Sequence, residues 1–96
     1  MECRHILIKG RVQGVGFRAS ASSRARSLEI YGTVENLNDG SVEIYCCGDK
    51  KNLDPFIDYL KNNPGWSSVS DININKINDK NKAEKILNSG SFNILR

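Results

Sequence analysis

Residues 10–18 read GRVQGVGFR, and this stretch constrains the chain more than any other. The residues before it alternate in the manner of a β-strand, and those after it repeat with helical spacing. Its three glycines can adopt positive φ, so the backbone can form a concave turn that approaches a ligand closely. The unpaired N–H groups at the start of the following helix attract anions, phosphate above all. We therefore predict an oxyanion site at residues 13–18, built mainly from backbone.

Two side chains are candidates to complete this site. Arg18 falls in the first turn of the predicted helix, where its permanent charge and planar fork could hold two phosphate oxygens at once. Asn36 ends the next predicted strand, just before a turn. An asparagine at a strand end is often only a turn residue, and its type and position alone favour that interpretation over a role in the site.

Periodicity along the rest of the chain predicts alternating strands and helices. The expected strands cover residues 3–9, 31–36, 41–47, 69–76 and 91–95, and the expected helices run from Phe17 and across residues 51–63. Asp39-Gly40 predicts a hairpin turn. Pro55 is tolerated in a first helical turn, which predicts that the second helix begins near Asn52 or Asp54. Residues 78–90 are polar and predict a loop with room for one helical turn at residues 83–87.

The resulting order is β-α-β-β-α-β with a short terminal strand. This order predicts the α+β class: a ferredoxin-like sandwich with two helices on one face of a mainly antiparallel sheet. Ninety-six residues suit a single domain spanning residues 1–96. That architecture hosts many functions and decides none by itself.

Composition indicates which partners and which cellular compartment to expect. The net charge is only +3 and the basic residues are scattered, which disfavours nucleic acid as a partner. No apolar run is long enough for a membrane span and no leader pattern is visible, so we expect no membrane contact and a cytoplasmic location. In that compartment the three cysteines should be free thiols, since the adjacent Cys46 and Cys47 could pair only with strain. A single histidine, His5, predicts no zinc site, and its place on a strand favours a packing role over that of a general base.

The glycine stretch admits other interpretations. A phosphate-binding P-loop requires Lys-Ser or Lys-Thr after its glycines, and none is present. Residues 14–19 match the dinucleotide fingerprint G-x-G-x-x-A, with Glu35 near the end of the next strand. The hairpin at Asp39-Gly40 and the short chain argue against the doubly wound sheet that such a site needs. A turn that merely packs would leave Arg18 unexplained.

Two spaced motifs resemble the paired signature of the acylphosphatase family. The first is G-x-V-Q-G-V-G-F-R at residues 10–18, and the second is G-x-V-x-N-x-x-D-G-x-V at residues 32–42. Gly48, the helix across residues 53–60 and the closing F-x-I at residues 92–94 extend the resemblance over nearly the whole chain. It implies a hydrolase that cleaves the carboxyl-phosphate bond of small acyl phosphates to carboxylate and inorganic phosphate, with water as the direct nucleophile and no metal or other cofactor.

The resemblance also implies the site residues. Arg18 would bind the phosphoryl group together with the backbone N–H groups of Gly14, Val15, Gly16 and Phe17, and Asn36 would position the attacking water. The chain departs from the family pattern at Glu29, which replaces a glycine after the first helix. It also departs at Leu37, which replaces a threonine, and at Pro64-Gly65, where Gly-Pro is usual. None of these departures touches Arg18 or Asn36.

An acyl phosphate has a good leaving group, because the carboxylate departs without needing a proton. Positioning and charge stabilisation can then suffice, and no side chain needs to act as nucleophile or base. We expect a metal-independent monomer. One alternative is a module that recognises phosphate or carbamoyl phosphate with little or no turnover. A ferredoxin-like RNA binder is a further alternative, although the aromatic pattern of such binders is absent from the strands.

Overall fold

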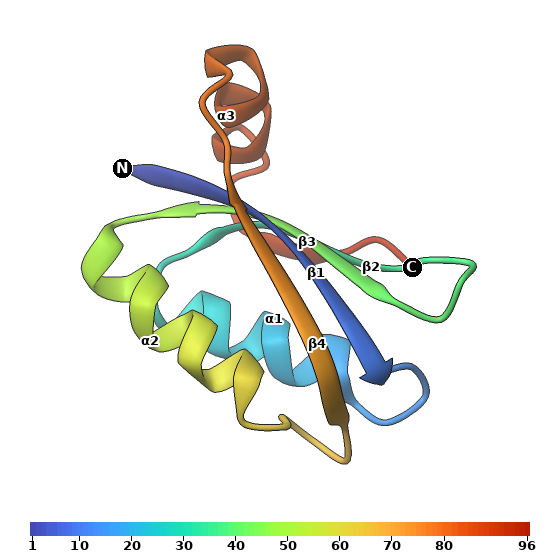
Figure 1. Ribbon diagram of the computed structural model, residues 1–96. Coiled ribbons are helices and arrows are strands. Elements are labelled where there is room, and N and C mark those ends of the chain that lie inside the picture. Colours follow the sequence, from blue (N-terminus) through green and yellow to red (C-terminus); the bar gives the residue numbers. More distant parts are fainter.

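The computed structural model describes residues 1–96, which form a five-stranded mixed sheet and three helices (Figure 1). In chain order the elements are β1 (Glu2–Arg11), α1 (Phe17–Ser27), β2 (Tyr31–Asn36), β3 (Val42–Gly48), α2 (Lys50–Lys61), β4 (Ser68–Lys76), α3 (Lys80–Leu87) and β5 (Phe92–Ile94). The strand order is β4-β1-β3-β2-β5, and only β5 lies parallel to its neighbour. This α+β arrangement is consistent with the expected ferredoxin-like sandwich.

The core lies between the sheet and the two helices α1 and α2, which cover the same face (Figure 1). Alternation along the strands directs one set of side chains to that face, so Ile6 of β1 lies opposite Ile44 of β3 and both are fully buried. The rings of Phe56 in α2 and Phe92 in β5 meet edge to face at 6.0 Å. None of the three helices is long and apolar enough to cross a membrane.

Helix α2 begins earlier than Pro55 led us to expect. Asp49 is its N-cap, and the N–H groups of Asn52 and Leu53 both donate to the Asp49 carbonyl at 2.9 Å. Pro55 therefore lies inside the helix, beyond its first turn, and the expected start near Asn52 or Asp54 is wrong. Proline leaves the carbonyl of Lys51 without a helical donor. Both Lys51 and Pro55 are exposed, so water can satisfy that carbonyl.

Residues 80–87 form a two-turn helix, α3, where a loop with at most one helical turn was expected. The Asp79 carboxylate caps it by accepting from the N–H groups of Asn81 at 2.9 Å and Lys82 at 3.4 Å. No residue of α3 is fully buried. The helix lies against β2 and β3 on the side of the sheet away from α1 and α2 (Figure 1).

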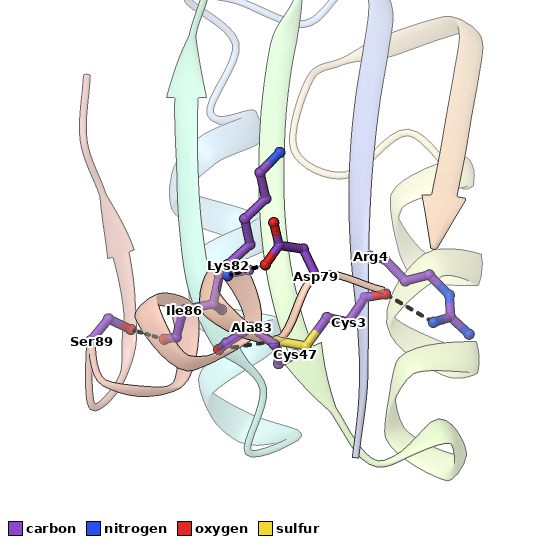
Figure 2. The surroundings of a disulfide bond; sticks show 8 residues. All are labelled: Cys3, Arg4, Cys47, Asp79, Lys82, Ala83, Ile86 and Ser89. Atoms are coloured by element: carbon purple, nitrogen blue, oxygen red, sulfur yellow. Dashed lines mark hydrogen bonds between the residues drawn. A yellow bond between two sulfur atoms is a disulfide. The ribbon is translucent and has the colours of Figure 1, made fainter. Parts of the chain in front are cut away.

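A disulfide joins Cys3 of β1 to Cys47 of β3, so the expectation of three free thiols is wrong (Figure 2). Cys3 and Cys47 are directly opposite each other in the antiparallel register, with Cα atoms 4.0 Å apart. Adjacent residues of a strand face opposite sides of the sheet, so Cys46 points into the core and remains free. The pairing depends on strand register, which the spacing of the cysteines alone does not reveal.

The state of the thiols can be counted directly. Burial raises the pKa of Cys46 to about 12, so this thiol should not react near neutral pH. The native chain purified without reductant should show no thiol reactive toward dithiodinitrobenzoate, and the unfolded chain should show one. Three reactive thiols in the unfolded, unreduced chain would contradict the Cys3–Cys47 pairing.

Glu29 occupies a left-handed position after α1, with φ of 55°. The N–H of Ile30 donates to the Ala25 carbonyl at 2.9 Å, and that of Glu29 donates to the Arg26 carbonyl at 3.2 Å. These two bonds are the pattern of a Schellman C-cap, in which glycine is the preferred left-handed residue. Glu29 therefore carries a left-handed strain that the family glycine would avoid.

Glu29→Gly should stabilise the chain. Removing the Cβ relieves a left-handed cost of roughly 1 kcal/mol. Urea unfolding should show that gain, and the melting temperature should rise by about 4–8 °C per kcal/mol for a chain of this size. Glu29→Ala removes the charge but keeps the Cβ, so it should leave stability close to that of the wild type. Equal stabilisation by both substitutions would assign the effect to charge instead of backbone.

Candidate active site

The segment between β1 and α1 presents a row of unpaired backbone donors. Gly14 and Gly16 both adopt left-handed conformations, with φ of 72° and 80°, and Gly16 is the N-cap of α1. The N–H groups of residues 14–19 donate no hydrogen bond to any backbone or side-chain acceptor of the protein. No acidic residue lies in the first turn of α1. This turn therefore offers several N–H donors and the positive end of a helix dipole.

Arg18 is the second residue of α1 and lies beside these donors. It lines a cavity of about 180 Å³ together with Val12, Gly14, Gly16, Phe17, Ala19 and Ile94. Its guanidinium forms no ion pair and no hydrogen bond within the protein. Val12 and Phe17 are buried on either side of the glycine turn and anchor it to the core. A fixed backbone cradle and a free guanidinium thus open onto the same small cavity.

Gln13 connects the glycine turn to the β2–β3 hairpin. Its side-chain Nε2 donates to two carbonyls of that hairpin, Leu37 at 2.8 Å and Ser41 at 2.9 Å. Both bonds join residues far apart in the sequence, so no local pattern points to them. The glutamine fixes the start of residues 13–18 against the residues that follow Asn36.

Asn36 is the last residue of β2 and precedes the carbonyl that Gln13 binds. Its side-chain Oδ1 is buried and has no hydrogen-bond partner, the only such side-chain atom in the protein. A buried acceptor left unpaired costs about 1–3 kcal/mol, so it calls for an explanation. Asn36 does not line the cavity of Arg18, and no hydrogen bond joins the two residues. They are linked through Gln13 and through β5, whose Ile94 lines that cavity and whose next residues bond to β2.

The hairpin itself is held by Asp39 and Ser41. The Ser41 hydroxyl and N–H both donate to the Asp39 carboxylate, and these bonds lower the pKa of Asp39. The Leu37 N–H closes the turn by donating to the Ser41 carbonyl at 2.9 Å. The turn is therefore built without the side chain of residue 37, where leucine replaces the family threonine.

His5 lies away from this region, on the sheet face opposite α1 and α2. Its Nε2 is 2.8 Å from a carboxylate oxygen of Glu43, and its ring is 4.7 Å from that of Tyr45. The histidine therefore packs on the sheet, in line with the expected role. No group of three or more His, Cys, Asp or Glu side chains is placed to hold a metal ion.

Comparisons with known proteins agree with the motifs. The family model of the acylphosphatases matches residues 4–93. This chain belongs to the acylphosphatase family. An acylphosphatase of Vibrio parahaemolyticus is 38% identical over 72 residues, which are 75% of this chain and 80% of that protein. The crystal structure of acylphosphatase from Bacillus subtilis superposes with a TM-score of 0.86 at 33% identity and covers 100% of both chains.

The same acylphosphatase fold also occurs inside a larger protein. Full-length HypF, in its phosphate- and nucleotide-bound form, matches 99% of this chain with a TM-score of 0.79 at 29% identity. The match covers only 12% of the HypF chain.

Proposed function

We propose that this chain hydrolyses small acyl phosphates to a carboxylate and inorganic phosphate. One observation supports the proposal above all. At the start of α1, the N–H groups of residues 14–18 have no partner in the protein and lie beside the free guanidinium of Arg18. Together they supply a fixed positive field for a phosphoryl group, which charge-assisted hydrogen bonds can hold. The family membership supports the same activity.

In the proposed reaction the phosphoryl oxygens bind to the N–H groups of Gly14, Val15, Gly16 and Phe17 and to the guanidinium of Arg18. The oxygen of a water molecule attacks phosphorus in line with the acyl oxygen. The bond between phosphorus and the acyl oxygen breaks, and the carboxylate leaves with the electron pair. A proton of the water passes to a phosphate oxygen. No side chain must gain or lose a proton, because the leaving group needs no proton and the positive field is already in place.

Asn36 orients the attacking water in this proposal. Its Nδ2 forms no hydrogen bond within the protein and, unlike Oδ1, is not buried, so it can donate a hydrogen bond to the oxygen of that water. The unpaired Oδ1 behind this amide is a local destabilisation of the kind that functional sites retain. The bonds from Gln13 to the hairpin would keep this carboxamide in a fixed place relative to the phosphate cradle.

We further propose that residues 1–96 act as one ferredoxin-like, mainly antiparallel domain, as a monomer in the cytoplasm, without a cofactor or nucleic acid. One cluster of 15 buried residues supports the single domain. Sedimentation velocity tests whether the chain is monomeric.

The Cys3–Cys47 disulfide argues against the cytoplasmic location, because disulfides persist mainly in oxidising environments. Fractionation of cells with thiols blocked at lysis tests location and disulfide together.

A second candidate is a phosphate- or carbamoyl-phosphate-recognising module with little turnover. The match to a small part of HypF favours it, since the fold there is one portion of a larger protein. Binding of phosphate without hydrolysis by the isolated chain would support this candidate.

Hydrolysis of benzoyl phosphate by the purified chain tests the proposed function. We expect release of benzoate and phosphate at a rate that survives excess EDTA, because Arg18 and backbone dipoles provide the charge. Loss of the rate in EDTA, with recovery on adding a divalent metal, would overturn the mechanism. Phosphate binding without turnover would overturn the enzymatic assignment.

A further inference from the structure

The turn at residues 64–66, between α2 and β4, lies directly against the glycine turn. The Trp66 N–H donates to the Val15 carbonyl at 2.9 Å. A Cβ added to Gly65, whose φ is 66°, would lie 2.8 Å from the Val15 oxygen and 3.2 Å from the Gly16 oxygen. The 64–66 turn therefore touches the backbone of two residues to which the proposed function assigns phosphate binding.

This contact orients one of the proposed phosphate donors. A peptide unit is planar and trans, so the Val15 carbonyl and the Gly16 N–H point in opposite directions. Because the carbonyl is bonded to Trp66, the Gly16 N–H points away from the 64–66 turn. The cavity that Arg18 lines includes Gly14 and Gly16 but none of residues 64–66. The bond thus directs this donor away from the turn that holds it.

The 64–66 turn is rigid enough to hold that peptide in place. Ser67 donates to the Pro64 carbonyl through its hydroxyl at 2.7 Å and its N–H at 3.3 Å. The Val69 N–H donates to the Asn63 side chain at 2.9 Å, and both Pro64 and Ser67 are buried. The contact itself leaves no room for a side chain at residue 65, since a Cβ there would displace backbone instead of a flexible side chain.

We propose that Gly65 and the Trp66 N–H are positioning residues for phosphate binding: they set the Val15–Gly16 peptide so that its N–H is preorganised for the phosphoryl group. This inference rests on the proposed function and names the device that fixes one donor of the site. A preorganised donor improves the affinity for phosphate because the peptide need not reorient on binding.

Gly65→Ala tests the proposal, with Gly90→Ala as its matched control. Gly90 lies between α3 and β5 with φ of 74°, and a Cβ there meets no atom within 4 Å. Both substitutions carry the same left-handed strain, but only the one at Gly65 displaces the Val15 carbonyl. We expect the inhibition constant of inorganic phosphate and the KM of benzoyl phosphate to rise about tenfold in Gly65→Ala with kcat largely kept. Gly90→Ala should leave both constants within about twofold of wild type. Equal constants in the two variants would overturn the proposal.

A second measurement uses the wild-type chain and so does not depend on the folding of a variant. If phosphate favours the Val15–Gly16 peptide orientation that Trp66 holds, linkage requires that phosphate also strengthens that hydrogen bond. Hydrogen exchange of the Trp66 amide should therefore slow as phosphate saturates the chain. The Gly90 amide, which donates to the Leu87 carbonyl at 3.3 Å, serves as a control and should not change. An unchanged Trp66 exchange rate in saturating phosphate would overturn the proposal.

These outcomes distinguish failure of the proposed function from failure of the role assigned to the 64–66 turn. Failure of the wild-type chain to bind phosphate or to hydrolyse benzoyl phosphate would remove the proposed function and this inference with it. Normal turnover, together with a hydrogen-exchange rate of the Trp66 amide that does not change with phosphate, would overturn only the role of the 64–66 turn.

Discussion

Arg18→Ala should lower kcat/KM for benzoyl phosphate about a thousandfold and abolish measurable inhibition by phosphate. Two charge-assisted hydrogen bonds to phosphoryl oxygens are worth about 1.5–3 kcal/mol each, and about 4 kcal/mol in total corresponds to roughly a thousandfold. Because Arg18 forms no ion pair or hydrogen bond in the protein, its loss should change the free energy of unfolding by less than about 0.5 kcal/mol. Steady-state kinetics and urea unfolding check the two parts.

Two further variants test whether the loss of phosphate affinity is specific to the guanidinium of Arg18. Arg18→Lys keeps the charge but loses the planar fork, so it should recover only part of the phosphate affinity. Arg24→Ala removes a guanidinium of the same helix that stacks on Tyr59, 4.3 Å from the ring centre. It should cost a little stability and leave phosphate binding intact. A comparable loss of phosphate affinity in Arg24→Ala would mean that general positive charge, not Arg18, attracts the anion.

Asn36→Ala should lower kcat about a hundredfold to a thousandfold, the range measured for loss of one preorganised hydrogen-bonding group in an active site. The inhibition constant of phosphate should stay within about twofold, because the carboxamide contacts the water and not the phosphoryl group. Removing an unpaired buried acceptor should also leave the chain as stable as wild type, or more stable by about 1 kcal/mol. Lower activity with undiminished stability is the signature of a functional residue.

The control for this variant is Asn93→Ala. Asn93 lies on β5, where its backbone pairs with Thr33 of β2 on the same sheet, and its side chain forms no hydrogen bond. It should keep wild-type kcat. Equal losses of phosphate affinity in Arg18→Ala and Asn36→Ala would contradict the separate roles assigned to them. A marked loss of stability in Asn36→Ala would assign the carboxamide to the fold.

Local patterns in the sequence predicted most of the fold, because the elements that build the core have clear periodicity. The strip of Leu53, Phe56 and Leu60 in α2 is fully buried, as its spacing indicates. The start of α1 at Phe17 follows from the glycines that precede it, since Gly16 takes the left-handed conformation that the pattern suggested. Patterns of this kind depend on neighbours within one or two turns.

The features that sequence reasoning missed depend on tertiary placement. The Cys3–Cys47 pair requires knowledge of strand register, and the early start of α2 requires knowing that Pro55 faces water. Helix α3 is short, rich in Lys and buries no residue, so its sequence has the polar composition of a loop. In the candidate site, the side chain of Gln13 and the Trp66 N–H act on carbonyls that are remote in sequence. Nothing in the local pattern marks these two contacts.

The proposed activity depends on the backbone of residues 14–18 and Arg18 holding a phosphoryl group together. Titration of ¹⁵N-labelled chain with inorganic phosphate, followed by amide chemical shifts, tests it most directly. The largest shifts should fall on residues 14–18, and Arg18→Ala should remove them. Shifts concentrated elsewhere, such as at Lys82 and Lys85 beside the separate cavity under α3, would contradict it.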